Sequence, residues 1–213
     1  MTPEFAKRID PVFLRVLDLL DRLSRGQNPP PRDEQTQIRR CLDAAEAALG
    51  QTDEWLLAKY ALVAWVDEVL IEAPWEGRTW WEQNALEWEL FQTADAYEKY
   101  FDKAVEASRL PAAKRDALEV FYVGVVLGFR GLYRDPSGAA AEQAGLPSNL
   151  ESWARETAQA ILLGLGRPSI PRGDRSVQGA PPLEARFTFV GVTLIGVILA
   201  VAAVIVGLVK TAS

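Results

Sequence analysis

Residues 60–75 read YALVAWVDEVLIEAPW, and this stretch shows most directly how the chain folds. Val63, Asp67 and Leu70 follow one another at steps of four and three, so they share one face of a helix. Thr52 can cap the N-terminus of that helix, and the proline near the end of the stretch stops it. The stretch therefore predicts a long, largely apolar helix with a carboxylate on its apolar face.

Helical periodicity continues on both sides of this stretch, and segments rich in proline and glycine separate the periodic runs. The fold class that we predict is all-α. About seven helices are expected, at residues 3–25, 34–49, 53–72, 79–91, 94–108, 111–132 and 149–164. Pro11 is expected to restart or bend the first helix. Helical spacing favours a helix over a buried strand at residues 119–129.

The composition of the 213-residue chain excludes several classes of function. Histidine is absent, which removes imidazole acid–base catalysis, Ser-His-Asp triads and histidine-containing metal sites. Cys41 is the single cysteine, so cysteine-cluster metal sites and intrachain disulfides are excluded as well. The net charge of −6 argues against a nucleic-acid-binding protein. We expect the protein to have no enzymatic activity and to bind neither a cofactor nor a metal ion.

Residues 187–209 predict a transmembrane helix. They contain 23 consecutive residues without a charge, and 15 of these are Leu, Ile, Val or Phe. A helix of this length rises roughly 34 Å, enough to cross a hydrocarbon core of about 30 Å. One face of the helix consists of small residues, namely Gly196, Ala200, Ala203 and Gly207. Small residues let a second helix approach closely, so we expect this face to associate with another membrane helix.

The segment before the transmembrane helix, residues 167–186, is rich in Pro, Gly and Arg and has no apolar period, which is typical of a linker. It carries four arginines, whereas one lysine follows the helix, so the positive-inside rule places the N-terminal part in the cytoplasm. We expect a helical cytoplasmic domain at residues 1–166, the linker, the membrane helix and a short tail at residues 210–213. The chain is expected to be tail-anchored.

Asp67 and Glu68 are the first candidate site. A carboxylate that faces a core needs hydrogen bonds or an opposite charge, and Arg130 and Arg134 are candidate partners of Asp67. Asp67 is interpreted as a buried structural residue or as part of a partner-binding site. Glu68 is rotated by about 100° on the helix and is expected to be exposed and available to a partner protein. Adjacent helix positions point apart, so the pair is not expected to form a catalytic dyad or a metal site.

Tryptophans form the second candidate site. Six of the seven lie between residues 55 and 88. Most are expected in the core, but Trp75, Trp80 and Trp81 flank a predicted loop. Exposed aromatic side chains at such a place could anchor a protein contact.

Glycines at steps of four and three, Gly124, Gly128 and Gly131, lie in the predicted helix at residues 111–132. Each costs about 1 kcal/mol relative to alanine in a helix interior. A close helix crossing, or a helix end near Gly131, would explain them. They do not form a phosphate-binding loop, because no strand precedes them and no Lys-Ser/Thr pair follows.

Several motifs together resemble the TssL/DotU (IcmH) family of bacterial secretion systems. The first group comprises YAL at 60–62, VDE at 66–68, PW at 74–75 and WW at 80–81. LEVFY at 118–122 and LGFRGLYR at 127–134 are similar to the family patterns LE-x-x-Y and LGF-x-G-x-Y, and EKYF at 98–101 to GE-x-FF without its preceding glycines. The residues of these patterns that we expect to be structural are Glu119, Gly128, Arg130 and Gly131.

The resemblance implies a structural subunit of the inner-membrane complex of a type VI secretion system. It implies a hook-like cytoplasmic domain made of two small helix bundles, and a homodimer through the transmembrane helix. The implied partners are a TssM/IcmF-type inner-membrane protein and baseplate subunits of the TssK or TssE type, the latter contacted through Asp67 and Glu68. Extended family members add a periplasmic peptidoglycan-binding domain, which is not expected here.

Three other functions remain open at this level. The chain could be a DotU-like stabilising subunit of a type IVB secretion system, or a tail-anchored regulatory adaptor. It could also be a tail-anchored enzyme that uses Asp67, Glu68 and an arginine. Such an enzyme requires a pocket in which at least two carboxylates converge.

Overall fold

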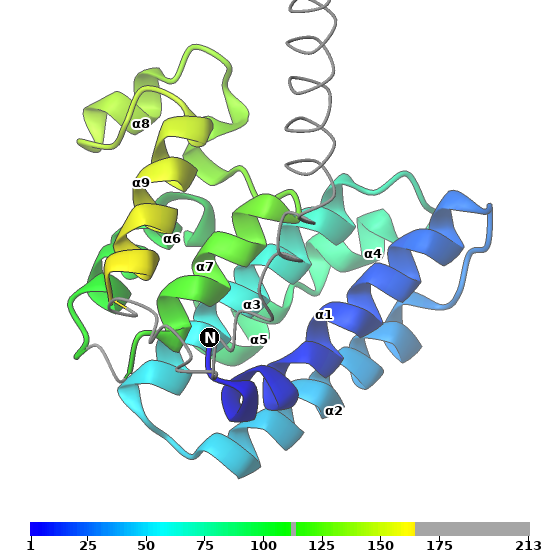
Figure 1. Cartoon of the computed structure of the whole chain (residues 1–213). Helices are drawn as coiled ribbons and strands as arrows, with labels where there is room; N and C mark the ends of the chain where they lie inside the picture. Colours follow the sequence, from blue (N-terminus) through cyan, green and yellow to red (C-terminus); the bar gives the residue numbers. More distant parts are fainter. Residues whose placement is uncertain (112–113, 165–213) are drawn as a thin grey trace, which may run out of the picture. The chain divides into compact units, whose positions relative to one another are not determined.

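Helix α3, Asp53–Glu72, is the central helix of the structure, because its sequence is apolar on nearly all sides (Figure 1). The computed structural model describes residues 1–111 and 114–164, which include nine α-helices and a short 3-10 helix. Helix α3 packs against four later helices: α4 (Arg78–Gln83), α5 (Leu86–Phe91), α6 (Ala96–Ser108) and α7 (Asp116–Val126). It packs more lightly against α1 (Pro3–Ser24) and α2 (Pro31–Leu49). The predicted all-α class and the predicted helix at residues 53–72 are confirmed.

Helices α1, Pro3–Ser24, and α2, Pro31–Leu49, form a hairpin beside α3 (Figure 1). The Thr2 side chain accepts a hydrogen bond from the Phe5 N–H, as expected of an N-cap. Pro11 lies inside α1 without ending it. Buried Glu34 joins the two helices, because it accepts hydrogen bonds from Arg15 (2.6 Å) and Arg22 (2.9 and 3.1 Å).

The predicted helix at residues 79–91 is wrong, because the structure has two short helices there. Helix α4 spans Arg78–Gln83 and α5 spans Leu86–Phe91. The first main-chain N–H groups of α5 donate to the Asp67 carboxylate of α3 instead of to a preceding turn. The Asp67 carboxylate of α3 thus caps the N-terminus of α5 and separates α5 from α4.

The predicted helix at residues 111–132 is too long at both ends. Helix α7 spans Asp116–Val126 and a 3-10 helix, η2, spans Gly131–Arg134. Gly128 and Gly131 have φ values of +113° and +50°, a backbone region that favours glycine and interrupts a right-handed helix. Only Gly124 lies inside α7, close to the Tyr100 hydroxyl of α6, Ala96–Ser108.

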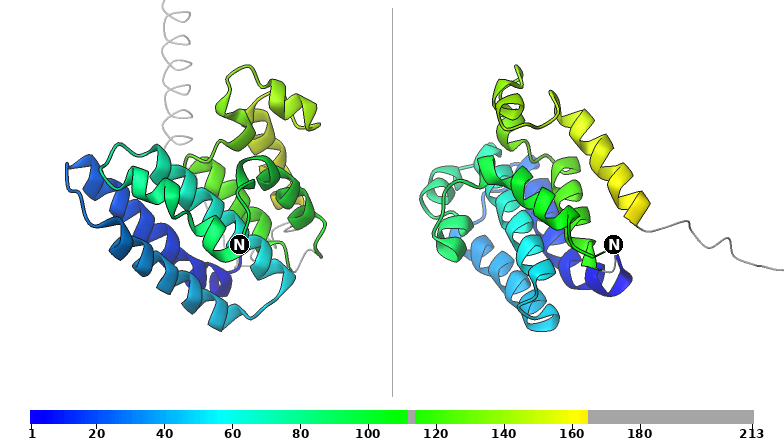
Figure 2. Two further views of the ribbon diagram at one scale, coloured as in Figure 1. Left: turned by 180° about the vertical axis from the view of Figure 1, so that it is seen from behind. Right: turned by 90° about the vertical axis from the view of Figure 1, so that its left-hand side faces the viewer.

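The remaining helices lie around α7. Helix α8, Ala139–Gln143, was not expected from the sequence, whereas α9, Leu150–Gly164, agrees with the helix expected at residues 149–164. Helix α9 packs on α7 (Figure 2), and its Trp153 ring lies 5.1 Å from the Phe101 ring of α6, centroid to centroid.

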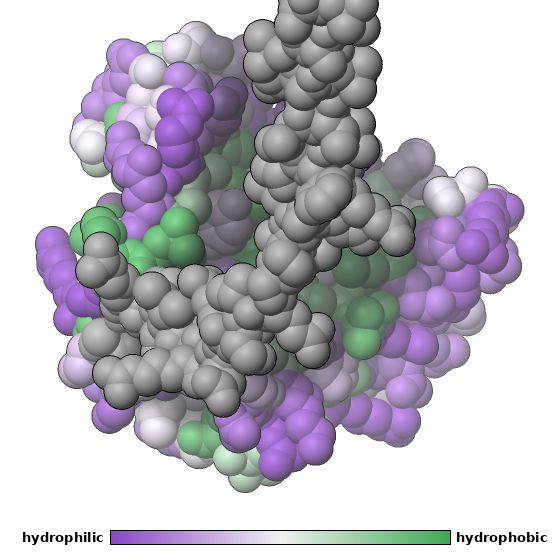
Figure 3. Space-filling view, viewed as in Figure 1, coloured by the Kyte–Doolittle hydropathy of each residue, from purple (hydrophilic) through white to green (hydrophobic). Residues whose placement is uncertain are grey.

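On the face in Figure 3, the regions of α8 and of the α1–α2 connection are mainly hydrophilic, and hydrophobic residues gather between them.

The predicted linker, transmembrane helix, tail and small-residue face at Gly196, Ala200, Ala203 and Gly207 lie outside the described residues. Among the helices that the structure does describe, none is both long enough and apolar enough to span a bilayer.

Candidate functional site

Asp67 is buried near the C-terminal end of α3, with 6% of its surface exposed. It accepts hydrogen bonds from the Trp81 indole N–H (2.8 Å) and from the main-chain N–H groups of Leu86 (3.0 Å) and Glu87 (2.7 Å). The two amides belong to the first turn of α5, where N–H groups lack partners within the helix. Asp67 therefore caps α5 and fixes the α4–α5 connection on α3.

Glu87 continues this arrangement from α5 to α6. The residue is 9% exposed, and its Oε1 accepts hydrogen bonds from the Thr93 hydroxyl and from the N–H groups of Asp95 and Ala96, each at 2.9 Å. One buried carboxylate thus holds the start of α5 and a second holds the start of α6. The sequence did not reveal this role of Glu87. Its partners lie just after Gln92, whose left-handed backbone conformation turns the chain back toward Glu87, and no local pattern predicts that conformation.

Glu68 is buried, also 6% exposed, so the expectation that it is exposed is wrong. Its carboxylate accepts hydrogen bonds from the main-chain N–H groups of Arg130 (2.7 Å) and Gly131 (3.2 Å). Arg134 lies 3.8 Å from the same carboxylate and pairs more closely with Glu72, at 3.1 Å. Glu68 therefore fixes the turn between α7 and η2 on α3.

The expected ion pair of Asp67 with Arg130 or Arg134 does not form. Arg130 is an exposed residue, and its main-chain N–H donates to Glu68 rather than to Asp67. Arg134 pairs with Glu68 and Glu72 rather than with Asp67. The two adjacent carboxylates hold two different connections, consistent with adjacent helix positions pointing apart.

Burial dominates the titration of both carboxylates. It raises the pKa of Asp67 from 3.8 to about 6, against the opposing effect of its three N–H donors. Burial also raises the pKa of Glu68, while the N–H groups of Arg130 and Gly131 and the charge of Arg134 favour its ionised form. The arrangement keeps two costly buried charges in place by hydrogen bonding them to the main chain.

The raised pKa of Asp67 predicts a pH-dependent stability. Between about pH 4 and about pH 6 the native state binds this proton more tightly than the unfolded chain does, so the contribution of Asp67 lowers the free energy of unfolding as the pH rises. The change is on the order of 3 kcal/mol. We expect the stability difference between wild type and Asp67→Asn to be larger at about pH 4 than at about pH 7, measured by urea unfolding. An equal difference at both pH values would contradict this.

Two of the three tryptophans that the sequence singled out beside a loop are buried. Trp81 and Trp75 are buried, with 0% and 9% of their surfaces exposed, and their indole N–H groups donate to Asp67 and to the Leu70 carbonyl. Trp80 is half-buried. The exposed tryptophan of this region is Trp88 on α5, at 58%, which sequence reasoning did not single out. No local pattern singles it out, because Ala85 and Phe91, three residues before and after it, are apolar.

The residues expected to be structural have separate roles. Gly128 and Gly131 form the turn after α7, and a Cβ at Gly131 would lie 2.7 Å from the Tyr97 carbonyl oxygen. Glu119 on α7 forms an ion pair with the N-terminal amino group of Met1. The N-terminus of the chain is thereby attached to α7.

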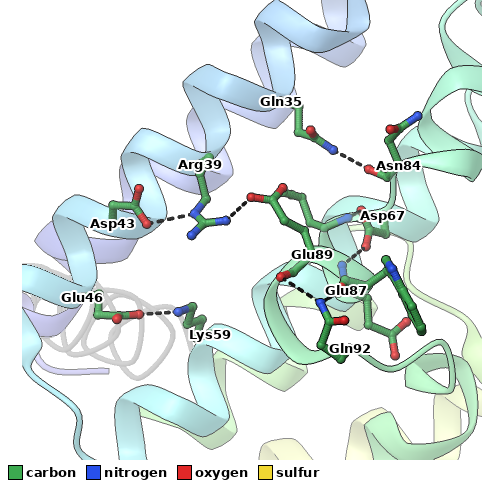
Figure 4. Close-up of polar contacts among 12 residues, drawn as sticks. Gln35, Arg39, Asp43, Glu46, Lys59, Asp67, Asn84, Glu87, Glu89 and Gln92 are labelled. Carbon is green, nitrogen blue, oxygen red and sulfur yellow. Dashed lines mark hydrogen bonds and ion pairs between the residues drawn. The ribbon is translucent and has the colours of Figure 1, made fainter.

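Polar contacts also join α2 to the α3–α5 region (Figure 4). Arg39 on α2 pairs with Glu89 of α5, and Glu46 at the end of α2 pairs with Lys59 of α3. The side chains of the Arg39–Glu89 pair are 33% and 50% exposed, so this pair contributes little stability and mainly orients the helices.

A groove runs between the first half of α3 and α6, and we call it the α3–α6 groove. Its volume is about 860 Å³. Its apolar lining consists of Leu56, Leu57, Tyr60, Phe91 and Leu110. Its charged lining consists of four carboxylates and two lysines: Asp53, Asp95, Asp102, Glu106, Lys99 and Lys103. Asp67 and Glu68 are not part of it.

Within residues 1–111 and 114–164, no group of three or more Cys, Asp or Glu side chains is placed to hold a metal ion. Asp67 and Glu68 are occupied by main-chain and indole N–H donors. These hydrogen bonds suit the two carboxylates to holding the α4–α5 and α7–η2 connections in place rather than to proton transfer.

Comparisons with known proteins agree with this architecture. No curated protein matches the chain. The solved cytoplasmic domain of TssL from Acinetobacter baumannii matches with a TM-score of 0.60 and 22% identity, over 76% of this chain and 99% of that chain. At this identity the match shows a common fold. A sequence model of the family described as "Type VI secretion system protein DotU" matches residues 7–211. The chain therefore belongs to the DotU family of type VI secretion system proteins.

Proposed function

We propose that the chain is a structural, non-enzymatic subunit of the inner-membrane complex of a type VI secretion system. Its helical part links a TssM/IcmF-type membrane protein to cytoplasmic baseplate subunits of the TssK or TssE type. The observation that carries the proposal is the family match over residues 7–211, joined to a helical domain with the TssL fold. The family description names a type VI system, which favours this function over the type IVB alternative.

The buried carboxylates support a role in shaping contact surfaces. Asp67 and Glu68 fix the connections that precede α5 and η2, so they influence partner binding through those connections rather than by touching the partner. A protein that works by contact needs rigid connections, whereas an enzyme needs an accessible reactive group. This revises the implied direct contact of the acidic pair with the baseplate.

Residues 187–209 are proposed to anchor the chain in the inner membrane, with the helical part in the cytoplasm and the C-terminus in the periplasm. The support is the uncharged length of this segment and the excess of arginine before it. Gly196, Ala200, Ala203 and Gly207 are proposed to form the face through which two copies associate.

Affinity purification from crosslinked native membranes tests the proposed function. The full chain carries an affinity tag in this experiment. We expect mass spectrometry to recover a large IcmF-type membrane protein together with baseplate subunits, and neither from membranes of an untagged strain. Recovery of neither partner from the tagged strain would overturn the proposal.

A further inference from the structure

We propose that the α3–α6 groove binds a basic, amphipathic helix of a partner protein. The groove combines an apolar floor, an excess of carboxylates and a buried hydroxyl group without a hydrogen-bond partner. This inference rests on the proposed function, since it gives the chemistry of one partner of that complex. Three separate features of the groove carry it.

The apolar floor is large enough for several side chains. Leu56 is 41% exposed, and Leu57, Phe91 and Leu110 are each partly exposed. The volume of about 860 Å³ lies within the range of about 300–1,000 Å³ that is typical of ligand sites. Both long walls are helices, so apolar side chains spaced three or four residues apart on a bound helix would fit between them.

The charged lining favours a cation. Lys99 pairs with Asp95, and Lys103 pairs with Glu106 at 3.0 Å. Asp53 and Asp102 remain, and neither forms an ion pair with any residue that the structure describes. A lysine or arginine of the partner would supply the missing opposite charge and would also steer association.

Tyr60 provides the third feature. It is 8% exposed and lines the groove, and its hydroxyl has no hydrogen-bond partner among the described residues. A buried polar group left in this state costs free energy, which a polar group of a bound partner can recover. Burial, and then the charges of Glu87, Asp95 and Glu106, raise the pKa of Tyr60, so the hydroxyl stays protonated in a negative surrounding.

A partner protein fits the groove better than this chain does. A second copy would bring a net charge of −6 to an already acidic site. Residues 167–186 of the same chain carry arginines, but they are rich in proline and glycine and lack an apolar helical period. The expected occupant therefore carries both basic and helically spaced apolar residues.

Site-specific photocrosslinking in native membranes tests the proposal with the full chain. A photoreactive amino acid replaces Leu56 in the groove and, as the control, Leu14 on α1, which is 65% exposed. We expect Leu56 to crosslink to a partner peptide that has apolar residues at helical spacing and at least one Lys or Arg. The Leu14 position should not give that product.

Further variants test the chemistry of the contact. Asp102→Lys should lower the crosslinking yield at Leu56 at least about fivefold, whereas Glu142→Lys, an exposed change on α8, should leave it unchanged. Exchanging the crosslinked partner lysine or arginine for glutamate should restore the yield with Asp102→Lys. Tyr60→Phe should weaken crosslinking about twofold to tenfold without lowering the unfolding midpoint, since it removes an unpaired hydroxyl.

Three results would overturn the proposal: a crosslink within this chain or to a second copy, a crosslink to an acidic peptide, or no product beyond that of the Leu14 control. The affinity purification separates this failure from failure of the proposed function. If IcmF-type and baseplate proteins still co-purify with the wild-type chain, the secretion function stands and only the groove assignment is lost.

Discussion

Replacing Asp67 with alanine is expected to lower the free energy of unfolding by about 3–5 kcal/mol. The change leaves three donors without an acceptor, namely the indole N–H of Trp81 and the N–H groups of Leu86 and Glu87. These groups are buried, so each loses a hydrogen bond that water replaces poorly. Because Glu87 in turn holds the start of α6, the effect should extend beyond α5.

Urea unfolding of the full chain in detergent, followed by tryptophan fluorescence, measures this effect. Asp67→Asn is the comparison, because it keeps one acceptor oxygen and should lose less stability than alanine. Asp21→Ala on the exposed side of α1 is the control, with an expected change below about 1 kcal/mol. An unfolding midpoint of Asp67→Ala equal to that of wild type would show that the three donors find other partners.

Replacing Glu68 with lysine is expected to prevent stable folding. The ammonium group would face the N–H donors of Arg130 and Gly131 and would lie near the guanidinium of Arg134. A buried cation among donors and another cation has neither a hydrogen-bond acceptor nor an opposite charge, so the loss should exceed about 4 kcal/mol. From the sequence alone we expected Glu68 to be exposed and available to a partner protein, and its burial changes what this substitution should do.

Glu72→Lys is the matched control for this experiment. Glu72 lies one turn further along α3, pairs with the same arginine and has a side chain that is 41% exposed. Its reversal should cost less than about 1 kcal/mol. The measurement is the soluble yield and the circular dichroism of both variants. If Glu68→Lys gave wild-type helicity and an unchanged unfolding midpoint, the buried placement of Glu68 would be wrong.

These two variants also bear on the acidic pair as a binding site. If Asp67 and Glu68 act only through the connections that they hold, loss of partner binding should follow loss of stability across a series of substitutions. A variant that stays fully stable but loses baseplate subunits in the affinity purification would instead show direct contact. The pair would then have to become accessible in the assembled complex.

The sequence by itself determined the helical class and most helix positions, because these depend on local properties. The apolar period along α1, the apolar run of α3 and the cap at Thr2 act within a few residues of the chain. The break after α1 was also found from its glycine and prolines, although α2 begins at Pro31, inside the break that was expected at residues 26–33. They need no knowledge of distant segments. The exclusion of histidine and cysteine-cluster chemistry likewise followed from composition.

Only the tertiary structure decided where α4 gives way to α5, where α7 ends and what the acidic pair does. Each of these depends on contacts between residues far apart in the chain: Asp67 reaches Leu86 and Glu87, and Glu68 reaches Arg130. The sequence did contain a signal for the burial of Glu68, since Ala61, Ala64 and Trp65 precede it on the same face. It could not identify the partners, because a carboxylate pairs with whatever donors the folded chain brings to it, and that is a property of packing rather than of spacing.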